Sequence, residues 1–317
     1  MTAAAVYAHY LLIIVIHSAL CAMLPWLAGR LGIGTQAGVL SGVAGAVILG
    51  WWPPGAETLA AIVLSLMLIV FLRRWTGGRS GSARSLLSGM AFGVAFHLTP
   101  TLLPVMLGCM AFELWWARDR RRWFSLVVMA LGVALACVPW AWRNYAVFHE
   151  FFFIRSNLGL ELRVAHHQGA AADIEVTTAR GTLRHPGRHP EEARMVRELG
   201  EMEYMRRARR EALEWIRTHP AAFLRLTGMR VFHFWCGPLR LPWMAAGITL
   251  LTILALLGAR RTLPALSTPQ RAALLIPLAT YPLIYYLVSY IPGYRVPLDW
   301  ILLMFAGAEL WHWIRRR

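Results

Sequence analysis

The chain has 317 residues, of which 58% are hydrophobic and 15% are charged, and its formal net charge at pH 7 is +16. In a soluble protein this charge would indicate nucleic-acid binding, but here apolar runs recur along nearly the whole chain. We interpret much of the charge as short basic loops that orient membrane helices, and we expect no nucleic-acid partner.

Long apolar runs predict membrane helices, because about 20 apolar residues are needed to cross the hydrocarbon of a bilayer. Residues 86–116 suit two short passes, and Thr99-Pro100 should separate them, since the residue before proline disfavours helix. The sequence therefore predicts an all-α, polytopic membrane protein with about nine passes. Single passes are expected over residues 6–27, 36–52, 57–72, 123–142, 243–257, 272–291 and 297–314.

Short arginine-rich loops predict the orientation, because basic residues mark the cytoplasmic ends of membrane helices. The loops at 52–56, 98–101 and 291–296 then face outside, and so does the N-terminus. Residues 1–7 lack the positive charge of a signal peptide, so we expect that a preceding helix has been lost or lies on a partner chain. The basic loops lie at Arg30, 73–84, 118–122, 260–271 and 315–317.

Residues 145–235 are expected to form an extracytoplasmic loop domain between N-terminal membrane helices (1–144) and C-terminal membrane helices (236–317). This segment holds most of the acidic residues and histidines of the chain. Apolar residues at steps of three and four predict a helix that begins at Pro190 and ends near Thr218.

Neither the histidines nor the cysteines predict a metal centre. The adjacent His166 and His167 point in different directions on any regular element and lack a third ligand at metal spacing. The cysteines form no CxxC pair, so we expect small buried thiols rather than ligands or disulfides. They are Cys21, Cys109, Cys137 and Cys236. The sequence predicts no cofactor.

Several local patterns occur in a fixed order along the chain. They are GMAFGVAFHLTPTLLP at 89–104, PWAWRNY at 139–145, RSNLGLEL at 155–162, ALEWIRTHP at 212–220 and GYRVPLD at 293–299. Together they resemble motifs of the GT-C membrane glycosyltransferases, in particular glycosyltransferase family 39, which includes protein O-mannosyltransferases and the aminoarabinose transferases of lipid A. Glu57 resembles the acidic residue that starts an early helix at the outer face in this family.

The resemblance implies a membrane glycosyltransferase that uses a polyprenyl-phosphate-linked sugar as donor at the extracytoplasmic face, in the inner (plasma) membrane of a bacterium. The reaction needs a base for the acceptor hydroxyl and cations for the departing phosphate. Arginine suits phosphate because its planar fork donates two parallel hydrogen bonds. The expected donor-phosphate residues are Arg295, Arg155, Arg143 and Tyr294, and the expected catalytic residue is Glu57.

Each of these residues also has a simpler interpretation. An arginine at the membrane boundary can anchor the chain to lipid headgroups, and Glu57 can be a helix N-terminal charge favoured by the helix dipole. Enzymes of this family begin with a helix and a large acidic outer loop, to which nothing here corresponds. The alternatives are therefore a non-catalytic membrane subunit or degenerate homologue that keeps the lipid-phosphate pocket, or an O-antigen ligase or polymerase, for which residues 180–185 supply a weak Arg/His cluster.

Overall fold

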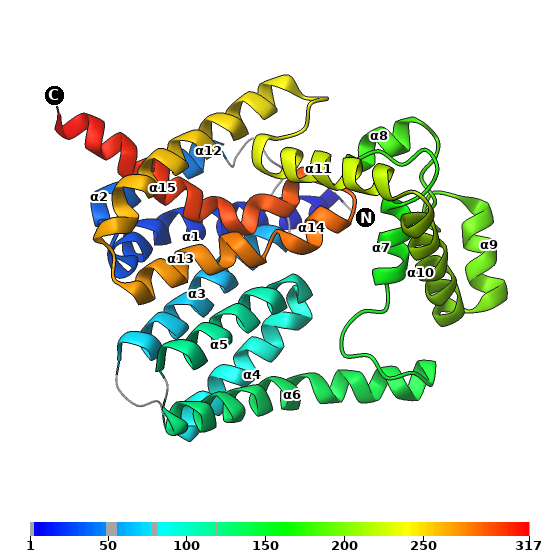
Figure 1. Ribbon diagram of the computed structural model, residues 1–317, viewed down its shortest axis with the longest axis horizontal. Helices are drawn as coiled ribbons and strands as arrows, with labels where there is room; N and C mark the ends of the chain where they lie inside the picture. The colour runs from blue at the N-terminus through cyan, green and yellow to red at the C-terminus, as the bar shows by residue number, and fades with distance from the viewer. Residues whose placement is uncertain (1–2, 49–55, 78–80, 118, 317) are drawn as a thin grey trace. The chain divides into compact units, whose positions relative to one another are not determined.

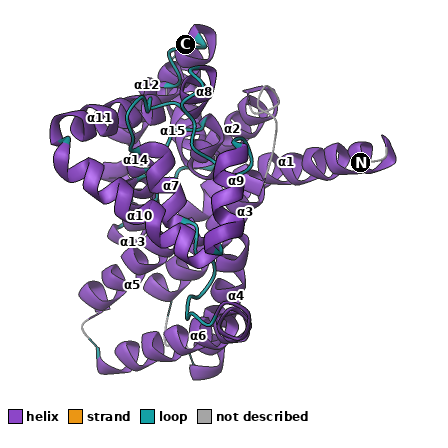
Figure 2. Ribbon diagram, turned by 90° about the vertical axis from the view of Figure 1, so that its right-hand side faces the viewer, coloured by secondary structure: helices purple, strands orange, loops and turns teal. Residues whose placement is uncertain are grey.

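The computed structural model describes the whole chain except residues 1–2, 49–55, 78–80, 118 and 317 (Figure 1). Every regular element in the described part is a helix, as Figure 2 shows, and pairing of extended backbone is limited there to one isolated bridge between Asp173 and Tyr290. The predicted all-α class is confirmed for these residues. All of the cysteines are free thiols, as expected.

Four described helices are long and apolar enough to cross a membrane. These segments are Tyr7–Leu31 in α1 (Ala3–Leu31), Glu57–Thr76 in α3 (Ala56–Thr76), Arg120–Phe148, which is α6, and Pro242–Ala265, which contains α12 (Pro242–Thr262). Other expected passes are shorter than the roughly 20 residues that a bilayer requires. They include α2 (Thr35–Ile48), α4 (Ser82–Leu98), α5 (Leu103–Ala117) and α13 (Thr268–Thr280). The count of nine passes stays a prediction.

Proline and glycine set several of the breaks. The predicted break at Thr99-Pro100 is confirmed, since α4 ends at Leu98 and a short 3-10 helix, η2 (Pro100–Leu102), precedes α5. The segment expected to form a single pass over 272–291 is not one continuous helix. Tyr281 and Pro282 separate α13 from α14 (Leu283–Leu287), because proline cannot donate the hydrogen bond that would continue the helix.

The single helix expected from Pro190 to Thr218 is also two helices, α9 (Pro190–Leu199) and α10 (Glu201–Thr218). Gly200 lies between them with φ 77° and ψ 157°, a conformation that glycine adopts without the steric penalty of a Cβ. The two predicted ends, Pro190 and Thr218, are confirmed. His219-Pro220 follows and opens α11 (Pro220–Cys236).

The chain divides into two compact units. Unit 1 comprises residues 1–136, 246–281 and 293–317. Unit 2 comprises residues 137–245 and 282–292. Unit 2 therefore includes the predicted loop domain, the end of α6 and the segment that contains α14.

In unit 1 the helix α15 (Val296–Arg315) is buried along most of its length and packs against α2 and α3. The Ser41 hydroxyl in α2 lies 2.8 Å from the Leu303 carbonyl oxygen, to which it donates. A Cβ added to Gly307 would lie 2.4 Å from the Ala37 carbonyl oxygen, so α2 and α15 touch backbone to backbone. Small residues permit such close approach of apolar helices. The 3-10 helices η3 (Leu263–Ala265) and η4 (Pro292–Arg295) lead into α13 and α15.

Unit 2 combines α7 (Leu158–Ala165) and α8 (Ile174–Ala179) with α9, α10, α11 and α14. One apolar cluster of unit 2 consists of Leu160, Val164, Leu183 and Tyr204, with Ile174, Met195, Val196 and Met205 packed around it. Buried ion pairs and hydrogen bonds also join the helices of unit 2.

Candidate functional site

Arg295, a predicted site residue in unit 1, is buried and bonded to other residues of this unit. Arg295 is 2% exposed, and its Nε donates to Asp299 Oδ1 at 2.6 Å. Its Nη1 donates to the Thr252 hydroxyl of α12 at 3.2 Å. The Arg295 charge is thus paired with the Asp299 carboxylate inside unit 1. Tyr294 precedes Arg295 in η4 and is half-buried.

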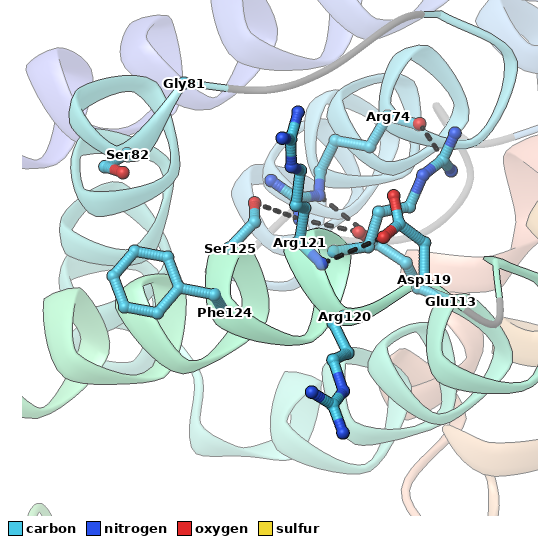
Figure 3. Close-up of a pocket in the computed structure, with 10 residues that line it drawn as sticks. Arg74, Gly81, Ser82, Glu113, Asp119, Arg120, Arg121, Phe124 and Ser125 are labelled. Carbon is cyan, nitrogen blue, oxygen red and sulfur yellow. Dashed lines mark hydrogen bonds and ion pairs between the residues drawn. The ribbon is translucent and has the colours of Figure 1, made fainter.

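Glu57 lies in the first turn of α3 and is half-buried. The outer loop expected before it, residues 52–56, lies mostly outside the described residues. A pocket of about 430 Å³ in unit 1 (Figure 3) contains none of the predicted site residues. It lies among the predicted cytoplasmic loops and is analysed separately below.

Unit 2 brings two of the sequence motifs together at the end of α6. The Trp140 indole donates to the Ile154 carbonyl oxygen at 3.3 Å, and the Asn144 amide donates to the Phe152 carbonyl oxygen at 3.0 Å. Trp140 and Asn144 are one helical turn apart, so they present donors on one face of α6. These two bonds hold the chain just before Arg155 against the helix end that carries Arg143.

Arg143 and Arg155 are both exposed, in contrast to Arg295. The Arg143 guanidinium lies over the Trp140 and Phe148 rings, 5.4 and 5.6 Å from their centroids. It also donates to Asn144 Oδ1 at 3.2 Å. An aromatic platform favours a cation electrostatically and leaves the guanidinium edge for an anionic ligand. Arg143 thus lies near the end of a helix long and apolar enough to span a membrane, and Arg155 lies in the segment that follows this helix.

Glu161 is the residue of this site that sequence reasoning missed. It lies in the first turn of α7, where the Asn157 amide donates to its carboxylate at 3.2 Å. Burial raises the pKa of Glu161, whereas the charges of His185 and Arg155 and the hydrogen bond from Asn157 lower it. A half-buried carboxyl with a raised pKa beside a cation is a candidate proton acceptor. The RSNLGLEL motif contains Glu161, but the sequence does not show the burial that raises its pKa.

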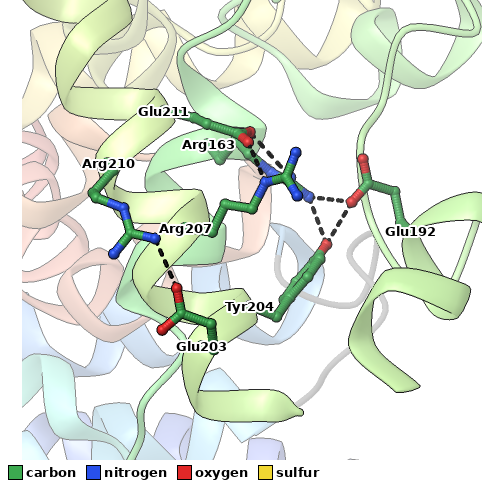
Figure 4. Close-up of polar contacts among 7 residues, drawn as sticks. All are labelled: Arg163, Glu192, Glu203, Tyr204, Arg207, Arg210 and Glu211. Carbon is green, nitrogen blue, oxygen red and sulfur yellow. Dashed lines mark hydrogen bonds and ion pairs between the residues drawn. The ribbon is translucent and has the colours of Figure 1, made fainter. Parts of the chain in front are cut away.

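A buried ionic cluster fixes α7 relative to α9 and α10 (Figure 4). Arg163 of α7 is 2% exposed and donates to Glu192 of α9, to the Tyr204 hydroxyl of α10 and, at 3.3 Å, to Glu211. The Tyr204 hydroxyl in turn donates to Glu192 at 2.7 Å. Burial and the hydrogen bond to Glu192 raise the pKa of Tyr204, which keeps this phenol protonated. This cluster holds the helix on which Glu161 lies.

Arg230 of α11 forms a second group of buried hydrogen bonds in unit 2. Its side chain is fully buried and donates to the carbonyl oxygens of Ala165 and Leu287, the last residues of α7 and α14. The negative ends of two helix dipoles therefore face its charge. It also donates to His166 Nε2 at 3.0 Å, while Leu162 O lies 3.0 Å from His166 Nδ1. These partners assign the proton of His166 to Nδ1.

The pKa of His166 gives a testable pH dependence. Burial, and next the Arg230 charge, lower the pKa of His166 from 6.5 to about 4. Because the folded pKa is the lower one, its contribution to stability is complete above pH 6.5 and is lost as the pH falls toward 4. At pH 5 the expected loss is roughly 2 kcal/mol. We expect the thermal unfolding midpoint of the wild type to fall from pH 7 to pH 5 more steeply than that of His166→Gln, and equal slopes would contradict this assignment.

Other polar groups of unit 2 do not form a nucleophilic triad. Asp173 caps α8 and accepts from Arg240 at 2.8 Å, and it lies near the buried His233. Among the described residues, neither ring nitrogen of His233 nor the Ser289 hydroxyl has a hydrogen-bond partner, so no base is aligned on the serine. Both nitrogens of His166 are used within the protein, and no group of three or more His, Cys, Asp or Glu in the described part is placed to hold a metal.

Comparison with family models, with curated proteins and with solved structures found no match to this chain.

Proposed function

We propose that this chain is an integral membrane protein with about nine passes and that residues 145–235 lie outside the cytoplasm of a bacterium. We further propose that it acts as a glycosyltransferase-like protein on a polyprenyl-phosphate-linked sugar. The observation that supports this most is the junction at the end of α6. There, Trp140 and Asn144 hold the chain before Arg155 next to the helix end that carries Arg143. The half-buried Glu161 follows Arg155 by six residues, in the first turn of α7.

The proposed reaction uses Glu161, Arg143 and Arg155. The acceptor hydroxyl gives its proton to Glu161 while its oxygen forms a bond to the anomeric carbon of the sugar. The bond between that carbon and the phosphate oxygen breaks, and the lipid phosphate leaves with the electron pair. Arg143 and Arg155 stabilise the charge that develops on it. The resemblance also suggests roles in the reaction for Glu57, Arg295 and Tyr294 of unit 1, and these roles remain proposals.

A non-catalytic role is the second candidate, and a specific observation favours it. Arg295, which the resemblance assigns to the donor phosphate, is buried and ion-paired with Asp299. A protein in this role would bind the lipid phosphate at Arg143 and Arg155 without transferring its sugar.

The test uses radiolabelled polyprenyl-phosphate sugars and measures both donor binding and sugar transfer. It compares membranes that contain the wild type, Arg155→Gln, Glu161→Gln or Arg197→Gln. We expect Arg155→Gln to weaken donor binding about tenfold to a hundredfold, because a charge-assisted hydrogen bond contributes roughly 1.5–3 kcal/mol. Glu161→Gln should keep donor binding and lower the transfer rate about a hundredfold or more. Arg197 is an exposed arginine of α9 and serves as the control.

The outcomes separate the two candidates. Donor binding that depends on Arg155 without transfer by any variant would indicate the non-catalytic role. Wild-type binding and transfer in both Arg155→Gln and Glu161→Gln would refute the proposed site.

A further inference from the structure

The pocket of unit 1 lies where several helix ends meet (Figure 3). The end of α3 contributes Arg74, the start of α4 contributes Gly81 and Ser82, and the end of α5 contributes Glu113. The start of α6 contributes Asp119, Arg120, Arg121, Arg122, Phe124 and Ser125. The pocket holds about 430 Å³, which is large enough for a small polar headgroup.

The floor of the pocket is a closed and neutral network. Arg74 is 6% exposed and Glu113 1% exposed, and Arg74 donates to the two Glu113 oxygens at 2.9 and 2.6 Å. Its remaining donors reach the Ser85 and Ser125 hydroxyls at 3.1 and 3.0 Å. Because this ion pair is bidentate and fully satisfied, it is a rigid base rather than a ligand-binding group.

The rim of the pocket is positively charged. Arg122 donates to the Arg74 carbonyl oxygen at 3.3 Å, at the negative end of α3. Arg120 and Arg121 are exposed, and Figure 3 shows that their side chains extend in different directions from the start of α6. Asp119 is the one carboxylate of the lining besides Glu113. Four arginines against these two carboxylates leave two positive charges in excess.

An apolar stripe runs along α6 away from this rim. Phe124, Val127, Leu131 and Leu135 recur at steps of three and four and are 62%, 62%, 54% and 49% exposed. Only 33% of the most apolar window of α6 is buried. Exposed tryptophans lie beside the start of the stripe, as is typical of a membrane interface. They are Trp115, Trp116 and Trp123.

We propose that this pocket binds the headgroup of an anionic phospholipid. The positive charge that Arg120 and Arg121 place at the rim attracts the phosphate, and the acyl chains lie along the exposed face of α6. Basic pockets between membrane helices select anionic headgroups because each arginine near the surface attracts them electrostatically. A free phosphate would use the arginines but not the stripe. The site depends on α6 crossing a membrane and is independent of sugar transfer.

The experiment uses the purified full chain in mild detergent with equal amounts of dioleoyl phosphatidylglycerol and dioleoyl phosphatidylcholine, and counts bound lipids by native mass spectrometry. We expect the wild type to prefer phosphatidylglycerol. The double variant Arg120→Gln/Arg121→Gln should lose that preference roughly tenfold to thirtyfold. Arg120→Lys/Arg121→Lys should keep most of it, because the charge remains.

The matched control is Arg73→Gln/Arg260→Gln, which removes the same charge from exposed helix ends that do not line the pocket. An equal loss in this control would assign the preference to overall charge and overturn the pocket. Inorganic phosphate provides the second arm. If millimolar phosphate displaces phosphatidylglycerol completely, the site is one for free phosphate and the lipid assignment fails.

Discussion

Glu192→Gln is expected to lower the free energy of unfolding of unit 2 by about 3–5 kcal/mol, because it removes one partner of a buried ion pair. Glu192 is 6% exposed and accepts from both Arg163 and the Tyr204 hydroxyl. Without its carboxylate, Arg163 keeps only Glu211, at 3.3 Å, as a charged partner.

The measurement is the rate of trypsin cleavage, since unit 2 is rich in arginine. This rate depends on the fraction of unit 2 that is transiently unfolded, and therefore on its free energy of unfolding. The cleavage rate should rise about a hundredfold or more for a loss of 3 kcal/mol or above. Glu191→Gln is the matched control, since Glu191 also lies in the first turn of α9 but is exposed. Both variants lose the same helix-dipole interaction, so equal rates would show that the buried cluster contributes nothing.

Gly258→Ala is expected to be the most damaging small substitution in unit 1. A Cβ at Gly258 of α12 would lie 1.8 Å from the carbonyl oxygen of Phe305 in α15. The backbone of α15 cannot move aside like a flexible side chain, so the two helices must separate. Overpacking of this kind costs typically about 1–3 kcal/mol and occasionally more. The predicted result is a lower thermal unfolding midpoint in detergent.

The buried thiols Cys21 and Cys109 can report this transition, because a thiol-reactive dye reaches them only after unit 1 opens. Gly247→Ala makes the same change in the same helix, where an added Cβ meets nothing within 4 Å. It should leave the midpoint unchanged or slightly higher. Similar shifts in both variants would mean that α12 and α15 do not rely on the close approach at Gly258.

The sequence by itself determined the helical class and those features that depend on neighbouring residues. Thr99-Pro100 breaks a helix wherever the chain places it, because the restriction is local. The spacing of Arg295 and Asp299 favours an ion pair for the same reason, since residues four apart share a helix face. Arg143 and Arg155 were predicted from short motifs, and both are exposed, Arg143 near the end of α6 and Arg155 in the segment that follows it.

Only the tertiary structure decided which of these groups are buried and which ones meet. Arg163 and Glu192 are 29 residues apart, and nothing in their local sequence marks them as partners. The raised pKa of Glu161 comes from its burial in the folded unit. Gly200 ends α9 through a backbone conformation that the periodicity of apolar residues does not reveal. The physical reason is that periodicity reports one helix at a time, whereas burial, ion pairing and the resulting pKa shifts arise between elements that are distant in sequence.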